Sequence, residues 1–177
     1  MKNTALNNLM YTGIVTLSQY IGSKKIKIAQ FHNAGGNPLF NFISDCLAGD
    51  FEVAKLARPT KIMLIQATES EDREQGTVSV EYDRRSGFIY LLTTPEKVYD
   101  NSRGIVRYSF AMSRDLLEGT EFNGIGLYAN SATEEDVAQF AAFCKVSDIK
   151  NKLTDSSIMI VDWELRISNI PGISNQV

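Results

Sequence analysis

Histidine and cysteine are scarce in this chain of 177 residues. It contains one His and two Cys, and the two cysteines, Cys46 and Cys144, lie far apart in the sequence. These counts exclude a His-rich metal site, a zinc site built from cysteines and a disulfide framework. Apolar residues flank both cysteines, so we expect two buried free thiols in a protein of a reducing compartment.

Long apolar runs and an excess of positive charge are also missing. Asn3, Asn7 and Asn8 interrupt the N-terminal segment, which therefore lacks the apolar run of about 7–15 residues found in a secretory signal. No window approaches the roughly 18 apolar residues of a membrane span. We expect a protein that is soluble when made. The net charge of −3 argues against a generally basic nucleic-acid binder.

The size and composition are those of one globular domain. With 44% apolar and 22% charged residues, a chain this long is expected to bury roughly 70% of its unfolded surface. We predict a single domain over residues 11–170. Residues 1–10 and 171–177 carry weak local signals, and we interpret them as an N-terminal arm and a C-terminal tail. Two explanations stay open: the segments become ordered on another subunit, or they are fraying chain ends.

Alternation of apolar and polar residues dominates the rest of the chain. In residues 157–168, the apolar positions are Met159, Val161, Trp163, Leu165 and Ile167, and charged or polar residues fill the positions between them. This period of two is typical of an antiparallel sheet with one buried face. Further strands are predicted at 12–20, 24–31, 60–66, 77–82, 88–94, 103–112, 122–129 and 140–146, with a hairpin turn at Gly22-Ser23, a hairpin loop at 83–87 and a mobile polar loop at 67–76.

One helix interrupts this pattern. Asn37 is predicted as its N-cap, Pro38 as its first residue and Gly49 as its end. The predicted apolar stripe consists of Leu39, Phe42, Ile43, Cys46 and Leu47. A short second turn is expected at 51–56 and the start of another helix at 133–137. The sequence therefore predicts a mainly β protein, a jelly-roll-like antiparallel β-sandwich with one amphipathic helix inserted near residues 38–56.

His32 is the only candidate for histidine chemistry. It precedes a glycine-containing segment, 33–37, that leads into the predicted helix, a setting that suits an anion site. The segment has neither the Walker pattern nor the dinucleotide glycine pattern, and the chain has no nucleophile elbow. We interpret 33–37 as a strand-to-helix corner where Gly35 and Gly36 supply unusual backbone dihedrals.

Three groups of acids were considered as sites. Glu69, Glu71 and Asp72 lack the spacing of a calcium loop, and Glu134, Glu135 and Asp136 favour a helix start. Asp162 and Glu164 lie two residues apart on the polar side of one strand, an arrangement that would serve a glycosidase only beneath a cleft. We therefore predict no enzyme activity, no catalytic residue, no metal site and no cofactor.

The charges are distributed unevenly along the chain. Residues 1–66 have a net charge of +4 and residues 67–177 a net charge of −7. Solvated faces explain this distribution, and so does a subunit whose positive part contacts the negative part of a neighbour.

Two stretches resemble a family of small tailed-bacteriophage virion proteins. The first runs from Phe31-His32-Asn33-Ala34-Gly35-Gly36 through Cys46-Leu47-Ala48-Gly49 to Arg58-Pro59-x-Lys61-Ile62. The second is Phe122-Asn123-Gly124-Ile125-Gly126-Leu127-Tyr128, followed by Lys150 or Lys152 and by Trp163-x-Leu165-x-Ile167. The family shares an F-x-E-I-G-L-Y/F strand, a lysine-bearing loop and a final V-x-W-x-I strand. This chain departs from it at Gly124, where the family has Glu.

The resemblance implies a β-sandwich subunit of a tail, collar or fibre-attachment assembly. Its expected partners are further copies of itself and other virion proteins (portal, collar, tail or fibre subunits), with no direct nucleic-acid binding and no membrane. Such a protein is assembled in the bacterial cytoplasm and ends in the virion. The alternative function is a carbohydrate-binding module for host recognition, with Tyr90 or Tyr128 as the exposed aromatic platform.

Overall fold

The computed structural model describes residues 9–100, 103–117, 120–147 and 158–169. Its strands are β1 (Leu9–Ile21), β2 (Lys24–Gly35), β3 (Pro59–Asp72), β4 (Thr77–Arg84), β5 (Ile89–Tyr90), β6 (Glu96–Asp100), β7 (Arg103–Ser113), β8 (Gly124–Ala129), β9 (Ala142–Lys145) and β10 (Ile158–Asn169). Its helices are α1 (Asn37–Ala48), α2 (Phe51–Ala57) and α3 (Arg114–Leu117). The prediction of a mainly β chain with a helical insertion near residues 38–56 is confirmed.

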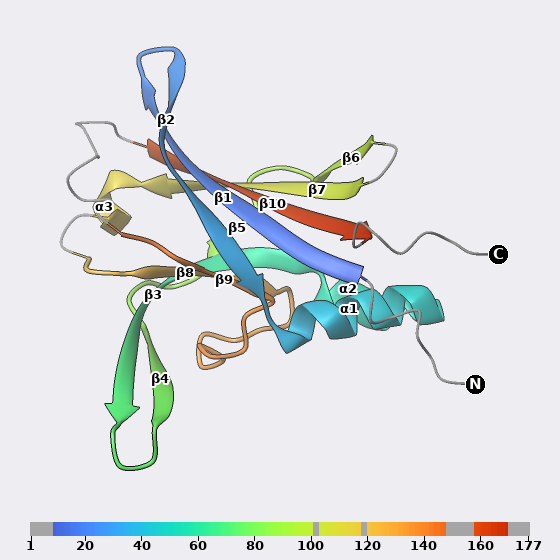
Figure 1. The fold of residues 1–177 in the computed structure, drawn as a ribbon. Helices are drawn as coiled ribbons and strands as arrows, with labels where there is room; N and C mark the ends of the chain where they lie inside the picture. The colour runs from blue at the N-terminus through green and yellow to red at the C-terminus, as the bar shows by residue number, and fades with distance from the viewer. Residues whose placement is uncertain (1–8, 101–102, 118–119, 148–157, 170–177) are drawn as a thin grey trace, which may run out of the picture.

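The strands form one continuous antiparallel sheet that folds into two layers (Figure 1). The first layer contains β2, β1, β10, β7 and β6, and the second contains β9, β8, β3, β4 and β5. Strand β2 belongs to both layers, because it pairs with β1 along most of its length and with β9 at Ala34 and Gly35. This strand order does not confirm the finer prediction of a jelly-roll-like sandwich of two sheets.

A second connection ties the layers together on the side away from β2. The backbone N–H of Leu91 donates to the carbonyl of Thr60 in β3, with N and O 2.8 Å apart. The N–H of the next residue, Leu92, donates to the carbonyl of Ser109 in β7 at 2.9 Å. The chain after β5 therefore bridges the second layer and the first, so both sides of the core are held by backbone.

The main core lies between the two layers. Val161, Trp163 and Phe110 from the first layer and Ile62, Leu127 and Cys144 from the second are all fully buried in one apolar cluster. The inward positions predicted for residues 157–168 are confirmed for Met159, Val161, Trp163 and Leu165. Each buried aliphatic or Met side chain contributes roughly 1.5–3 kcal/mol. Because a slip of one residue would expose the whole row, this burial fixes the register of β10.

The part of the second layer where β3 pairs with β8 is buried on both faces. In β3, Ile62 and Leu64 belong to the main core, whereas Met63 and Ile65 are equally buried but lie outside that cluster. The segment 130–141 covers this outer face, and the hydroxyl of Tyr128 donates to the carbonyl of Val137 at 2.7 Å. A continuous apolar run, as in residues 62–65, is typical of a strand with no solvated face.

The helical insertion consists of two helices separated by Gly49 and Asp50. Gly49 has the φ of 78° that favours glycine and ends α1, as predicted. The carboxylate of Asp50 accepts from the N–H of Val53 at 3.3 Å and so caps α2. The N-cap of α1 is Gly36, one residue before the predicted Asn37.

Only the first two turns of α1 pack against the core. Leu39 is buried, and Phe42 and Ile43 are partly buried against the same cluster. The prediction that Leu47 belongs to the buried stripe is wrong. Leu47 lies in the helix after the residues that contact the core, and it is 73% exposed.

Three local predictions are wrong for physical reasons. Residues 83–87 do not form a hairpin loop, because β4 and β5 each pair with β3 and not with each other. Residues 67–72 are not a loop, because they continue β3 and pair with β4 as far as Asp72 opposite Thr77. Residues 133–137 do not form a helix. The carboxylate of Asp136 accepts from both the N–H and the hydroxyl of Thr133, at 2.8 and 2.9 Å, and closes a turn instead.

The predicted terminal segments fall mostly outside the described residues. This holds for residues 1–8 of the predicted arm and for the whole predicted tail, 171–177. The remaining two arm residues, Leu9 and Met10, pair with Asn169 and Ser168 of β10 and so belong to the sheet.

We predict that Gly36→Ala lowers the free energy of unfolding by about 1–3 kcal/mol, as overpacking does. A Cβ atom at Gly36 would lie 2.2 Å from the carbonyl oxygen of Phe140, which belongs to backbone and cannot rotate away. Denaturant unfolding measures the loss. The matched control is Gly104→Ala in β7, where a Cβ has no atom within 4 Å. An equal loss in both variants would contradict this account of the strand-to-helix corner.

Candidate functional site

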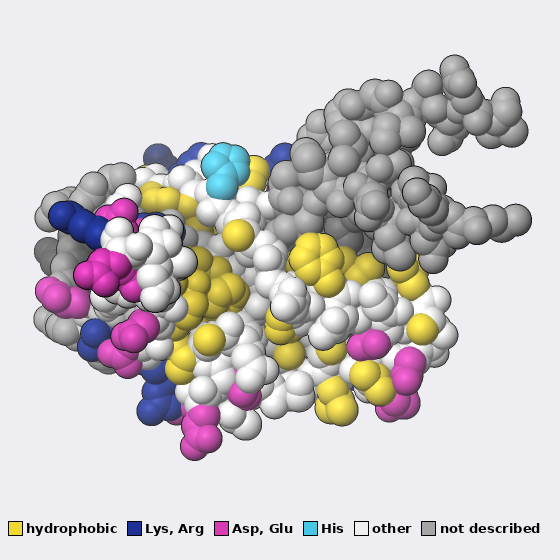
Figure 2. Space-filling view, turned by 60° about the horizontal axis from the view of Figure 1, so that its bottom comes forward, with side chains coloured by type: hydrophobic (Ala, Val, Ile, Leu, Met, Phe, Trp, Pro, Cys, Tyr) yellow, Lys and Arg dark blue, Asp and Glu magenta, His cyan; other side chains and the backbone are white. Residues whose placement is uncertain are grey.

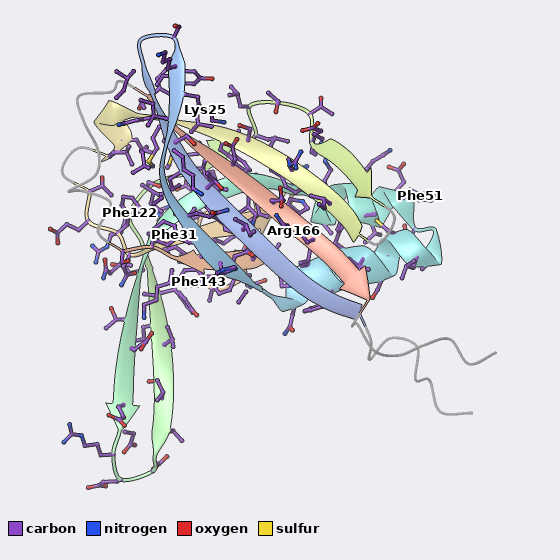
Figure 3. All side chains as sticks on the ribbon, turned by 45° about the horizontal axis from the view of Figure 1, so that its top comes forward. Lys25, Phe31, Phe51, Phe122, Phe143 and Arg166 are labelled. Carbon is purple, nitrogen blue, oxygen red and sulfur yellow. The ribbon has the colours of Figure 1, made fainter. Side chains whose placement is uncertain are left out.

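A polar hollow of about 400 Å³ lies on the outward face of the first layer. Figure 3 looks toward this face and labels Lys25 and Arg166, two residues of its lining. Thr16, Arg107, Asp162 and Glu164 also contribute to it. Because outward positions of neighbouring antiparallel strands adjoin, the polar residues that alternate with the core rows gather here.

Asp162 and Glu164, the carboxylate pair considered from the sequence, both line this hollow. The carboxylate of Asp162 accepts from the ammonium of Lys25 at 2.5 Å and from the hydroxyl of Ser109 at 2.9 Å. The carboxylate of Glu164 accepts from the Nε of Arg107 at 2.9 Å and from the guanidinium of Arg166. Both acids are therefore bonded to the neighbouring strand β7, and Asp162 is also bonded to the β1–β2 hairpin.

The electrostatics of the hollow keep Glu164 ionised. Partial burial raises the pKa of this carboxyl, but the hydrogen bonds from Arg107 and Arg166 outweigh it and hold the pKa below its usual value. The same contact raises the pKa of Arg107. A glycosidase needs one carboxylic acid with a raised pKa as its proton donor, and Glu164 has the opposite shift. The arrangement is suited to holding the strands or a polar ligand.

The histidine and glycine corner is a packing element. His32 is exposed on β2 opposite Ile14, and the single His (cyan) is visible on the surface in Figure 2. Gly36 has a φ of −105°, and neither Gly35 nor Gly36 has a positive φ, so the predicted unusual dihedrals are wrong. Glycine is required at position 36 because the carbonyl of Phe140 lies against it.

The other acidic groups make local contacts. Glu69 accepts from the ammonium of Lys145 at 2.7 Å, and this hydrogen bond lowers the pKa of Glu69. Asp72 accepts from the N–H groups of Glu74 and Gln75 in the turn after β3. Within the ranges that the structure describes, no cluster of three or more His, Cys, Asp or Glu is arranged to hold a metal ion.

The two cysteines are free thiols, as expected, and they differ in burial. Cys144 is fully buried, and burial raises the pKa of its thiol to about 12, which keeps it protonated. Cys46 is only partly buried, so the expectation of burial holds for one of the two.

Of the two tyrosines predicted as an exposed platform for sugar binding, one is exposed in the structure. Tyr128 is fully buried, with its hydroxyl bonded to Val137, so the prediction that it is exposed is wrong. Tyr90 is 65% exposed, and the ammonium of Lys61 lies 5.9 Å from the centre of its ring.

The motif at residues 122–128 forms part of the interior. Ile125, Leu127 and Tyr128 are fully buried. Asn123 joins β3, because its side-chain amide both donates to and accepts from the backbone of Ala67, at 2.8 and 2.7 Å. A Cβ atom at Gly124 would lie 2.5 Å from the ring of Phe143, so a glutamate fits at this position only if that ring moves.

Two β-hairpins extend beyond the layered body at opposite ends of the molecule (Figures 1 and 3). We call residues 19–28, at the β1–β2 turn, the basic arm: it carries three Lys and no acid. We call residues 68–82, at the β3–β4 turn, the acidic arm: it carries five acids and one Arg. Figure 2 shows acidic side chains (magenta) at the end where the acidic arm comes forward.

Both arms and the helices expose large apolar side chains. These are Tyr20, Ile21 and Ile26 on the basic arm, Val78 and Val80 on the acidic arm, and Phe40, Leu47, Phe51, Val53 and Leu56 on α1 and α2. Phe51 is labelled on the helices in Figure 3. Exposed apolar side chains gathered next to charges are typical of surfaces that contact another protein.

The sequence correctly predicted the hairpin turn at Gly22-Ser23, which forms the basic arm, but it did not indicate the hollow or the acidic arm. The alternating rows of β7 and β10 were recognised, but their pairing, which places Arg107 opposite Glu164, joins residues far apart in the chain. The strand propensity of residues 77–82 pointed indirectly to the acidic arm. A strand there needs a second strand to pair with, and the residues before Gly76 supply one of equal length.

Nothing matches this chain among protein families, curated proteins or solved structures. The resemblance to phage virion proteins is therefore a hypothesis based on the sequence motifs. Among the described residues, no helix has the length and apolar character needed to cross a membrane.

We predict that Glu164→Gln lowers the free energy of unfolding at pH 7 by about 1–3 kcal/mol, the range of hydrogen bonds to charged groups. Since the folded-state pKa of Glu164 is lowered, its contribution is fully present above the ordinary pKa of a glutamate and is lost as the pH falls through the folded-state pKa. The difference between variant and wild type should shrink in acid, as followed by urea unfolding across pH. Glu96→Gln is the control, because Glu96 is largely exposed and 3.7 Å from Arg107. A difference that grows in acid would contradict this prediction.

Proposed function

We propose that this chain is a structural subunit of a tailed-bacteriophage particle, in the tail, collar or fibre-anchoring region. It acts by binding further copies of itself and other virion proteins. The observation that carries the proposal is the pair of hairpin arms, which extend beyond the core and expose charged and large apolar side chains. Side chains of this kind, at the ends of a molecule, favour contacts with other proteins.

The assignment to a phage particle rests on the sequence motifs. Residues 31–62 supply β2, both helices and the start of β3, and residues 122–128 supply β8. The motif residues that are buried, such as Ile62, Leu127 and Trp163, form one shared core. The resemblance therefore concerns the framework of the fold, whereas the arms would determine which neighbours bind.

The rigidity of the body supports the same proposal. A subunit under mechanical load needs a scaffold that does not open, and here β2 and residues 91–92 join the two layers on both sides. On the outward face, the ion pair Arg107–Glu164 links the neighbouring strands β7 and β10, and the ion pair Lys25–Asp162 links β2 to β10 across β1.

Mass spectrometry of purified particles of a phage that encodes this chain tests the proposal. We expect the chain in every particle at a constant number of copies, retained after the particles are washed in high salt. The matched control is a non-structural protein of the same phage, which should be lost on purification. A chain that is abundant in infected cells but absent from the particles would contradict the proposal.

Carbohydrate binding is the second candidate, favoured by one specific observation. The ring of Tyr90 is 65% exposed, and an exposed ring of this kind can stack on a sugar. The ammonium of Lys61, which donates to the carbonyl of Ala132, lies 5.9 Å from the centre of this ring. If this candidate holds, glycan-array binding should fall at least about tenfold in Tyr90→Ala, which costs about 1.4 kcal/mol of binding free energy. Tyr20→Ala, another exposed tyrosine, is the control. Absence of any glycan binding by the wild-type protein would eliminate the candidate.

A further inference from the structure

We infer that copies of this chain associate head to tail by edge-to-edge strand pairing, with β4 on the acidic arm of one copy against β2 on the basic arm of the next. The inference rests on the proposed function, because it specifies the contact through which the subunits would assemble. It depends on open strand edges, opposite charges and matching apolar residues on the two arms.

Both arms present a strand edge that is open in the described part of the chain. Strand β4 is the last strand at one end of the sheet and pairs only with β3. Strand β2 pairs with β1 on one side, and on its other side only Ala34 and Gly35 pair, with β9. Residues 24–32 of β2 therefore offer backbone donors and acceptors to another strand. Open backbone of this kind is a template for another strand. The lysines on the edge of β2 oppose pairing with a basic strand and favour an acidic one.

The two edges match in length and in charge. The eight residues of β4 span about 26 Å, and the open part of β2 is at least as long. The basic arm contributes Lys24, Lys25 and Lys27, and the acidic arm has a net charge of −4. Repulsion between like charges opposes pairing of two basic arms or of two acidic arms. Pairing of a basic arm with an acidic arm is therefore favoured.

The side-chain faces of the two strands also match. Val78 and Val80 lie on one face of β4, and cross-strand pairing places Glu71 and Glu69 on that face too. On β2, Lys24 and Ile26 share one face while Lys25 and Lys27 share the other. A register that sets the two valines beside Ile26 puts Glu81 on the same face as Lys25 and Lys27. On one face of the joined sheet the valines then meet Ile26, with Glu69 and Glu71 on the same face as Lys24, and on the other face Glu81 meets lysines.

Some of these charges already have partners within the chain. Lys25 bonds to Asp162, Lys27 to Gln30 and Glu69 to Lys145. In the described residues no ion pair involves Lys24, Glu71 or Glu81, which leaves them available to a neighbouring copy.

The position of the arms determines the kind of assembly. They project from opposite ends of the molecule, so each contact joins two different surfaces (Figure 1). Contacts of this kind close into rings when the rotation between copies allows it, and otherwise grow into filaments.

Charge reversal with complementation tests the inference. One variant carries Lys24→Glu and Lys27→Glu and has two acidic arms, and the other carries Glu71→Lys and Glu81→Lys and has a less acidic, lysine-bearing β4 arm. We expect sedimentation velocity to show that the wild-type protein self-associates and that high salt weakens this association, since exposed charges are screened. Each variant alone should self-associate at least about tenfold more weakly, and mixing the two should restore association. The controls are Lys55→Glu on α2 and Glu135→Lys in the loop before β9, which should change nothing.

Hydrogen exchange separates strand pairing from contacts between side chains alone. The amides of residues 24–32 and 77–84 should become more protected as the protein concentration rises. Oligomers that persist unchanged in both variants, or association without this protection, would overturn the inference and leave the proposed function intact. A wild-type protein that stays monomeric but binds another virion protein would also overturn only the inference. A monomer that binds no virion component would overturn both.

Discussion

The structure depends on the burial of apolar side chains between two layers of a single folded sheet. Strand β2 is long enough to belong to both layers, and residues 91–92 join them again on the other side. Trp163, Phe110 and Leu127 fill the space between, and each row is held in register by the two strands beside it. Because every inward residue would become exposed by a slip of one position, the same burial fixes which residues face outward.

The outward rows follow from this constraint. Asp162, Glu164 and Arg107 lie together because their neighbours in sequence are buried, and the hydrogen bond from Arg107 helps to hold the pKa of Glu164 below its usual value. The arms have a different origin. Their strands continue past the core, where no opposite layer covers them, and so Val78, Val80 and Ile26 remain exposed. The body supplies stability, and the arms and the helices supply the surfaces open to other molecules.

Local patterns in the sequence predicted the fold class and much of the core. Alternation identified the inward positions of β10, and Gly49 marked the end of α1. Long-range pairing could not be predicted, and it decides the rest. The polar segment 67–72 is a strand because β4 pairs with it, and Thr133–Asp136 forms a turn because the covering segment bends to reach Ala141. Tyr128 was expected at the surface because its sequence position does not reveal that a loop covers the second layer.

A density map of the assembled particle tests the central claim most directly, namely that this molecule is a stiff two-layered body contacted through its projecting hairpins. The account predicts density for the chain with residues 19–28 and 68–82 at boundaries between subunits, and with Asn123–Tyr128 inside the subunit. A map in which both hairpins project into solvent, while the subunit is held through the polar hollow on its first layer, would contradict the account.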